Sequence, residues 1–348
     1  MRRFLKQSAL ATLKNSAVFA LARQTAWRNR RLVILGYHGV SVEDEHEWNP
    51  QLYITPELLE NRLRFLRRHG YNVISLSKGV EGLHSGDLPE RSVVLTFDDG
   101  VLDFYKAAYP ILKAYSFPST VYLTTYYAED NRPVLGITAD YILWKQRHRT
   151  VTLTVVPGIG GTMDLGDPSV REAIMKAIRT HAEAAHLNAD EKHDLLRRLS
   201  NETGFDFDRL CEKRILHVMA PGEARELAQA GVDFQLHTHR HRVPLDQALF
   251  RREILDNRER IEAITGRPCE HFCYPSGVYH QEFLPWLRAL NVKSATTCDP
   301  DICSGADEPL LLPRLLDQSN ISDVEFEGWC CGAAMWLRGF AGRPRAAA

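Results

Sequence analysis

The chain has 348 residues, of which 44% are hydrophobic and 25% are charged, and its formal net charge at pH 7 is −1. These are ordinary globular values that argue against a disordered chain, and the length suits one large α/β domain or two smaller ones. Because a net charge this close to zero gives no overall electrostatic footprint for nucleic acid, no nucleic-acid partner is expected.

The first thirty residues are basic and rich in alanine and leucine. Leu5, Leu13 and Leu21 fall on one helical face, and the cations lie mostly elsewhere. This spacing predicts a basic amphipathic helix over residues 1–30, lying either on a membrane surface or on the domain. A signal peptide ending near residue 22 is the alternative, but Lys14 and Asn15 interrupt its apolar region.

Seven cysteines without a Cys-x-x-Cys motif argue against a disulfide framework and favour a reducing compartment. The expected location is therefore the cytoplasm, at the membrane surface if the N-terminal helix contacts lipid, with export through an N-terminal signal as the alternative.

From residue 31, strand-like and helix-like segments alternate. Thr55 is a good N-cap in front of Pro56 and marks the start of one helix, which ends near residue 70. Strands are expected at residues 32–37, 72–75, 92–96, 119–124, 232–236, 269–274, 292–296 and 310–316. Further helices are expected up to residues 85 and 115 and over residues 221–230, 245–265 and 280–290. Repeating β-then-α units predict a parallel sheet, open or rolled into a barrel, over residues 31–338.

The alternation is lost over residues 129–216. Residues 150–156 and 162–165 flank a glycine-rich turn and predict a β-hairpin, and residues 169–186 and 190–200 are typical of helices. We therefore expect an insertion on the barrel face that covers the site and shapes substrate choice. The Gly/Ala/Arg-rich tail at residues 339–348 is expected to be flexible.

Two short segments suggest a metal site. Asp98 and Asp99 directly follow an apolar strand, where two adjacent carboxylates are costly to bury without a cation. His237 and His241, four residues apart, follow another predicted strand. One carboxylate and two histidines form a catalytic type of zinc set with an open position, and a second carboxylate beside it suits a base. The carboxyl ends of strands are where α/β barrels assemble their sites.

These segments resemble the motifs of the polysaccharide deacetylases, carbohydrate esterase family four, which share the nodulation-factor deacetylase homology domain. Residues 96–100 (TFDDG) resemble the first motif, and residues 237–241 (HTHRH) resemble the second. The resemblance implies an incomplete seven- or eight-stranded (β/α) barrel, Asp98 as the base, and Asp99, His237 and His241 as ligands of a divalent metal, most simply Zn²⁺.

Residues 272–277 (FCYPSG) are similar to the third motif of the family, although its usual arginine is missing. By that similarity the Ser276 N–H donates to the oxyanion, with Tyr274 and Pro275 beside the substrate. A buried base needs a cation to stay ionised, and Arg314 at the last strand is our candidate, with a surface arginine as the competing interpretation.

The family commonly supplies its general acid from a C-terminal Leu-x-x-His, and no histidine follows His280 here. Residues 35–38 (LGYH) have that form at the first strand, which resembles a permuted subgroup of the family and makes His38 the expected acid. Asp299 and Asp301 are either loop residues or contacts to sugar hydroxyls. His239 is expected to point away from the metal.

The expected function is metal-dependent removal of an N-acetyl group from an amino sugar of a polysaccharide or lipid-linked glycan. The same ligands would also serve a cyclic amide or ureide hydrolase of the superfamily. A non-catalytic carbohydrate-binding relative is the third possibility, and the presence of a second aspartate beside the ligand set argues against it.

Overall fold

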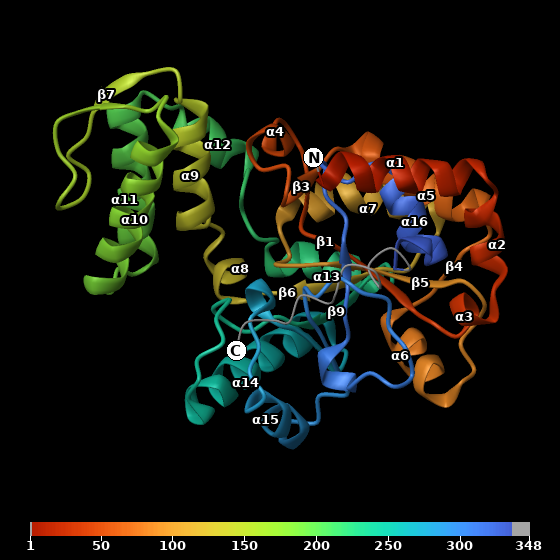
Figure 1. Cartoon of the computed structure of the whole chain (residues 1–348). Coiled ribbons are helices and arrows are strands. Elements are labelled where there is room, and N and C mark those ends of the chain that lie inside the picture. The colour runs from red at the N-terminus through yellow and green to blue at the C-terminus, as the bar shows by residue number, and fades with distance from the viewer. Residues whose placement is uncertain (1, 336–348) are drawn as a thin grey trace.

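A curled sheet of parallel strands forms the centre of the molecule. The computed structural model describes residues 2–335. The sheet has the spatial order β11-β10-β9-β6-β5-β1-β12 (Figure 1). Its strands are β1 (Val33–Tyr37), β5 (Ser92–Phe97), β6 (Thr120–Leu123), β9 (Asp233–Leu236), β10 (His271–Cys273), β11 (Ser294–Thr296) and β12 (Leu315–Leu316). β4 (Asn72–Val73) pairs with the start of β5, outside that order.

The two ends of the sheet approach each other through one short segment. β12 pairs with β1, and Leu312, just before β12, forms a single bridge to Thr296 of β11. Pro313 between them lacks an N–H, so the expected strand over residues 310–316 is interrupted. The prediction of an incomplete (β/α) barrel is therefore confirmed.

Helices cover the outside of the sheet, mostly where the sequence predicts them (Figure 1). The side chain of Thr55 accepts a hydrogen bond from the Leu58 N–H and caps α5 as expected. The covering helices are α5 (Pro56–Arg68), α6 (Leu76–Ser85), α7 (Tyr109–Tyr115), α13 (Pro221–Gln229), α14 (Gln247–Thr265), α15 (Phe283–Ala289) and α16 (Asp323–Cys331). The short elements η1 (Phe104–Ala108), η2 (Pro275–Gly277), η3 (Pro309–Leu311), α4 (Glu45–Trp48) and α8 (Tyr126–Asp130) and the pair β2 (Gly39–Val40) and β3 (Tyr53–Ile54) complete this part.

The N-terminal segment departs from the prediction of one amphipathic helix. It forms α1 (Arg2–Asn15), α2 (Val18–Gln24) and α3 (Ala26–Asn29), because Ala17 takes a left-handed conformation with φ 62° and Thr25 starts a new cap. Leu10, Phe19 and Ala22 are buried in the barrel core, and Leu21 from the expected stripe is 66% exposed. These helices therefore pack on the domain, and a membrane contact stays a prediction.

Arg28 ties this N-terminal segment to the barrel. Its buried guanidinium donates to the carbonyl oxygens of Arg31, Cys330 and Ser92, which lies at the start of β5. Burial lowers the pKa of this arginine from its ordinary value.

Among the described residues, no helix combines the length and apolar character needed to cross a membrane.

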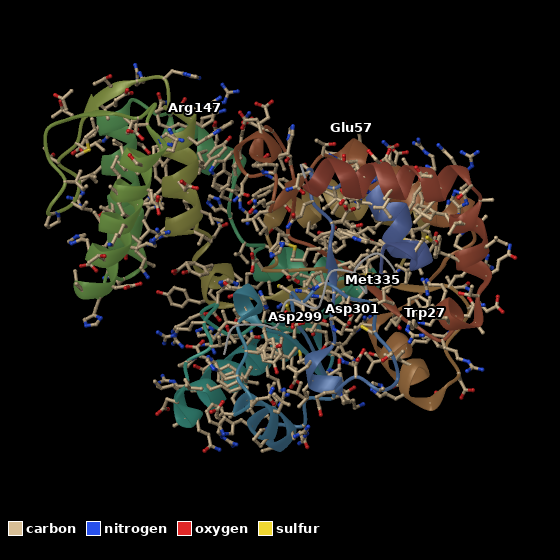
Figure 2. All side chains as sticks on the ribbon, viewed as in Figure 1. Trp27, Glu57, Arg147, Asp299, Asp301 and Met335 are labelled. Carbon is tan, nitrogen blue, oxygen red and sulfur yellow. The ribbon has the colours of Figure 1, made fainter. Side chains whose placement is uncertain are left out.

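The predicted insertion forms a separate lobe, residues 129–216, beside the barrel (Figure 1). It contains the expected hairpin of β7 (Thr150–Thr152) and β8 (Thr162–Asp164) and the expected helices α10 (Pro168–Ala184) and α11 (Ala189–Thr203). α9 (Leu135–Lys145) and α12 (Phe207–Lys213) were not predicted. The lobe has its own core, which Tyr53 joins from the barrel side. Arg147 on the lobe lies well apart from Asp299 and Asp301 on the barrel (Figure 2).

The lobe is attached to the loop that carries the two aspartates. The Met219 N–H donates to Gly100 O, the Leu102 N–H donates to His217 O, and Val101 bridges Val218. Gly100 adopts φ 75°, and a Cβ there would lie 2.3 Å from the Leu123 side chain, so glycine is needed at this turn. The described residues end at 335, so the expected tail lies outside them.

Candidate metal centre and its surroundings

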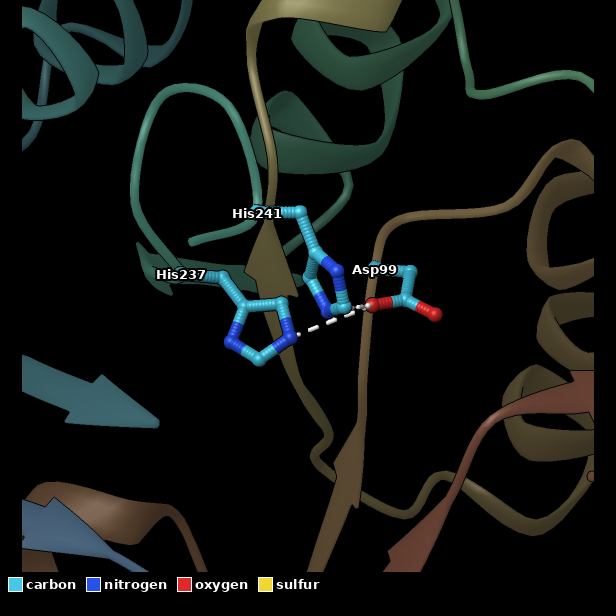
Figure 3. A group of neighbouring side chains, drawn as sticks. All are labelled: Asp99, His237 and His241. Atoms are coloured by element: carbon cyan, nitrogen blue, oxygen red, sulfur yellow. Dashed lines mark hydrogen bonds and ion pairs between the residues drawn. The ribbon is translucent and has the colours of Figure 1, made fainter. Parts of the chain in front are cut away.

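The site lies at the carboxyl ends of neighbouring barrel strands. Asp98 and Asp99 follow β5, His38 follows β1, and His237 follows β9. The sheet order puts β6 and β5 between β9 and β1, so residues from distant parts of the chain converge at one end of the barrel. Figure 3 shows Asp99, His237 and His241 meeting there.

Asp99, His237 and His241 bring their ligand atoms together. Nε2 of His237 and Nε2 of His241 each lie 3.1 Å from Oδ1 of Asp99, and the three ligand atoms lie within 4.8 Å of one another. In a tetrahedral zinc site with bonds of about 2.0–2.2 Å, ligand atoms lie roughly 3.3–3.6 Å apart. The donor set and its spacing therefore fit a divalent metal of the zinc type.

The tautomer of His237 suits a metal ligand. Its Nδ1 lies 2.8 Å from the carbonyl oxygen of Cys273, an acceptor, so Nδ1 carries the hydrogen and the Nε2 lone pair faces Asp99. The His237 backbone N–H donates to Asn257 Oδ1, and Nδ2 of Asn257 donates to Leu123 O. The Cys273 carbonyl thus orients the ring of His237, and Asn257 holds its backbone.

Backbone strain is concentrated at the same place. Asp99, Thr238, His241 and Ser276 all have positive φ, between 54° and 67°. Such conformations are uncommon for residues with a Cβ, and for the β-branched Thr238 they are costly, by roughly 1–3 kcal/mol. The strands that lead into these residues, β5, β9 and β10, are mostly buried and hold them in place.

The charges around Asp99 keep it ionised. Burial raises its pKa, but the two histidines outweigh burial and hold the pKa of Asp99 well below its usual range. The pKa of His241 is raised, because its attraction to Asp99 outweighs burial. An anionic aspartate facing two imidazoles is an attractive environment for a cation that replaces the histidine protons.

Asp98 is buried and held by Arg314. Two parallel hydrogen bonds of 2.7 Å join the Arg314 guanidinium to both carboxylate oxygens. Burial alone raises the pKa of Asp98, but the Arg314 charge more than offsets this, so the pKa lies below its ordinary value. The competing interpretation of Arg314 as a surface residue is wrong, because its side chain is fully buried.

Further contacts fix the orientation of Arg314. Its guanidinium also donates to the Thr297 carbonyl, to Thr96 Oγ1 and to the Cys273 sulfur at 3.1 Å. Cys273, which is fully buried, therefore contacts this arginine from the core. The donors of Arg314 are thereby satisfied, which a buried guanidinium requires.

His38 also lies close to Asp98. Its Nε2 is 3.7 Å from Asp98 Oδ2, and its side chain is 21% exposed. It is thus accessible from the site while touching the predicted base. The prediction that a first-strand histidine reaches the site agrees with this position.

The residues that resemble the third motif, 272–277, differ in burial: some lie in the core and Ser276 is exposed. Ser276 is exposed in a left-handed conformation, with φ 56°. Among the described hydrogen bonds its N–H has no assigned acceptor, whereas the Tyr274 N–H donates to Thr296 O and Pro275 has no N–H. The Tyr274 side chain is buried and its hydroxyl donates to Leu310 O. The expectation that Tyr274 contacts substrate is corrected accordingly: it supports the loop from the core, and so does the buried Pro275.

Three other candidates fall around the site. His239 points away from the cluster as expected, but it is buried and its Nδ1 pairs with Thr125 Oγ1 at 2.9 Å. Asp299 accepts a hydrogen bond from the Tyr279 hydroxyl, and Asp301 accepts one from the Ile302 N–H. These partners suit loop residues.

Asn257 was missed by the sequence analysis. It lies on α14 three residues after Ile254 and four before Ile261, both fully buried. An uncharged polar residue on the apolar face of a charge-rich helix was the available signal, since buried amides need partners.

Comparison with known proteins finds a relative that is similar over part of the chain. The poly-β-1,6-N-acetyl-D-glucosamine N-deacetylase of Escherichia coli K12 is 34% identical over 101 residues, which are 29% of this chain and 15% of that protein. The chain thus matches less than a sixth of the length of that relative.

Solved structures show the same fold. The Streptococcus pyogenes deacetylase PplD in complex with acetate is 21% identical, with a TM-score of 0.58 and coverage of 86% of this chain and 98% of the other. IcaB from Ammonifex degensii is 17% identical, with a TM-score of 0.54 and coverage of 86% and 97%. The sequence profile described as polysaccharide deacetylase matches residues 85–295, more than half of the chain, and the chain therefore belongs to that family.

Proposed function

We propose that this protein is a metal-dependent hydrolase that removes the N-acetyl group from an amino sugar in a glycan. The observation that carries the proposal is that two adjacent carboxylates at the site have different partners. Asp99 faces His237 and His241, and Asp98 beside it is held by Arg314. A carbohydrate-binding relative would need neither a metal set nor a buried, ionised base.

The metal set fits Zn²⁺ by ligand type, and other divalent transition metals accept the same ligands. When bound, such an ion would polarise the acyl carbonyl and lower the pKa of an attacking water. Asp98 then accepts the proton of that water. Arg314 keeps Asp98 ionised and oriented, and each carboxylate oxygen retains a lone pair after its hydrogen bond to the guanidinium.

The remaining steps use two further groups, the Ser276 N–H and His38. The Ser276 N–H donates to the oxygen that becomes negative as the amide carbon turns tetrahedral. His38 gives a proton to the departing amine, which would otherwise leave as a poor anionic group. Its Nε2 lies 3.7 Å from Asp98 Oδ2, so the proposed acid and the proposed base lie beside each other.

The name of a relative supports the proposed class of substrate. The matched Escherichia coli protein is named for poly-β-1,6-N-acetyl-D-glucosamine. We extend this chemistry to the present chain as an amino-sugar glycan of that kind, free or lipid-linked.

The test is acetate release from oligomers of β-1,6- and β-1,4-linked N-acetylglucosamine, measured with metal-loaded and chelator-treated protein. We expect release that chelation removes and Zn²⁺ restores, with metal content measured by elemental analysis. If metal-loaded protein released no acetate from any oligomer but opened small cyclic amides, the superfamily alternative would replace this proposal.

A further inference from the structure

A cavity of about 530 Å³ lies where the insertion lobe meets the barrel. Its wall combines aromatic and charged side chains from four elements. They include Trp48, Tyr127, Asp140, Arg171 and Arg179, with Gly136 at an open position of α9. Ligand clefts commonly have volumes of about 300–1,000 Å³, so the cavity is large enough to hold part of a ligand.

The cavity lies on the same face of the barrel as the metal centre. Trp48 belongs to the segment that follows β1, and Tyr127 belongs to the segment that follows β6. In the sheet, β5 lies between β6 and β1. The two aromatic residues therefore come from the loops on either side of the Asp98–Asp99 loop.

Packing connects both aromatic walls to the site. The Trp48 and Tyr53 rings lie 5.9 Å apart, and Tyr53 packs against Gly39, next to His38. On the other wall, Tyr126, which precedes Tyr127, packs against His239 at 5.7 Å. On each wall, one intervening tyrosine, Tyr53 or Tyr126, thus links the cavity to a residue that is within two positions of a site residue in the chain.

The wall has the chemistry of a sugar-binding surface. The Trp48 Nε1–H donates to Asp140 Oδ2 at 3.2 Å, which fixes the indole. The partly exposed rings of Trp48 and Tyr127 offer apolar area for the C–H faces of a pyranose. Carboxylate, amide and guanidinium groups surround these rings, and each still has free hydrogen-bonding capacity that could bind sugar hydroxyls. They belong to Asp140, Asn49, Arg171 and Arg179.

We propose that this cavity is an extended subsite that binds sugar units next to the one being deacetylated. The inference deepens the proposed function and rests on it. It assigns the insertion lobe a role in choosing polymeric over monomeric substrates, because only a substrate several units long reaches both the metal set and the cavity.

The sharpest test fills the cavity. Gly136 lies at the second position of α9, and an added Cβ meets no atom within 4 Å, so Gly136→Trp puts bulk into the cavity without a clash at its base. The matched control is Gly222→Trp, at the second position of α13, where an added Cβ also meets no atom within 4 Å and which is not part of the cavity wall.

We expect Gly136→Trp to lower kcat/KM for an N-acetylglucosamine pentamer by about tenfold or more relative to kcat/KM for a small aryl acetate. Gly222→Trp should leave that ratio at the wild-type value. Two further variants, Trp48→Leu and Arg179→Ala, remove side chains from the cavity wall, and each should lower the same ratio. Equal losses on both substrates, or an unchanged ratio in all three cavity variants, would overturn the subsite.

Binding separates this inference from the proposed function. Calorimetry of the pentamer with Asp98→Asn, with and without Gly136→Trp, measures the cavity without turnover. Weaker binding caused by Gly136→Trp supports the subsite even if acetate release fails, and that failure would count against the proposed reaction alone. Equal binding, in an enzyme that does release acetate, would count against the subsite alone.

Discussion

The barrel and the insertion lobe differ in how each positions its functional groups. In the barrel, the reactive groups are buried and tied by several hydrogen bonds each, as Asp98 and His237 show. In the lobe, a separate core supports a cavity wall whose polar groups are partly or fully exposed. The difference suggests that the barrel fixes the chemistry and that the lobe adjusts what reaches it. The following variants test this division, from the largest expected effect to the smallest.

Asp98→Asn should break the chemistry on every substrate. The amide keeps the shape of the carboxylate but cannot accept a proton, so we expect kcat to fall about 10³-fold, roughly 4 kcal/mol in the barrier. Metal content should not change, because Asp98 is not in the ligand cluster. Asp208→Asn, the same change at a side chain of the lobe that is 82% exposed, is the matched control and should keep wild-type turnover. Turnover near the wild-type rate in Asp98→Asn would remove this residue as the base.

Leu196→Ala should damage the lobe and spare the chemistry. Leu196 is 1% exposed in the core of the lobe, so the cavity left by truncation should cost about 3 kcal/mol of unfolding free energy. Chemical denaturation measures that loss, and activity on an aryl acetate at 25 °C should stay within about twofold of wild type. If small-substrate activity fell in parallel with stability, the two regions would form one functional unit.

His38→Ala should slow the barrel chemistry less than loss of the base does. Without a proton donor for the leaving amine, we expect about a 10²-fold fall in kcat for amides, roughly 2.7 kcal/mol. Aryl acetates, whose leaving groups need no proton, should lose much less. The alkaline limb of the pH–rate profile for amides should also change. His84→Ala, on the outer helix α6, is the control, and equal losses on amides and esters would contradict the role of general acid.

His217 should make the junction between the two regions sensitive to acid. Burial lowers its pKa to about 4, from an ordinary value of 6.5. The unfolded chain therefore takes up the proton first, and stability present above pH 6.5 is lost as the pH falls towards 4. For this one group we expect a loss of about 2 kcal/mol between pH 7.5 and pH 5.

His217→Asn should flatten this pH dependence, because the amide can still donate to Ile215 O and does not titrate. His186→Asn, on an exposed turn of the lobe, is the matched control. A pH dependence of unfolding that His217→Asn leaves unchanged would assign the acid sensitivity to other groups.

Much of the barrel was predictable because local rules and packing agree there. The apolar run at residues 92–96 is compatible with little other than a buried strand, and Thr55 before Pro56 is a clear helix start. Both elements appear where expected. The N-terminal segment was predicted less well. Its alanines and leucines are spread around the helix, so the sequence does not show which face is buried. Contact with α16 and the barrel core decides this.

The sequence by itself determined the parallel β/α alternation, the position of the insertion and the residue types of the metal set, because strand ends, turns and ligand spacing are local properties of the chain. The tertiary structure decided between the two interpretations of Arg314, which meets Asp98, and it alone showed that Asn257 holds His237 and that Tyr274 lies in the core. These contacts join residues between 20 and 216 positions apart, and barrel closure brings them together. No local pattern encodes such distances, because they depend on how the whole sheet curls.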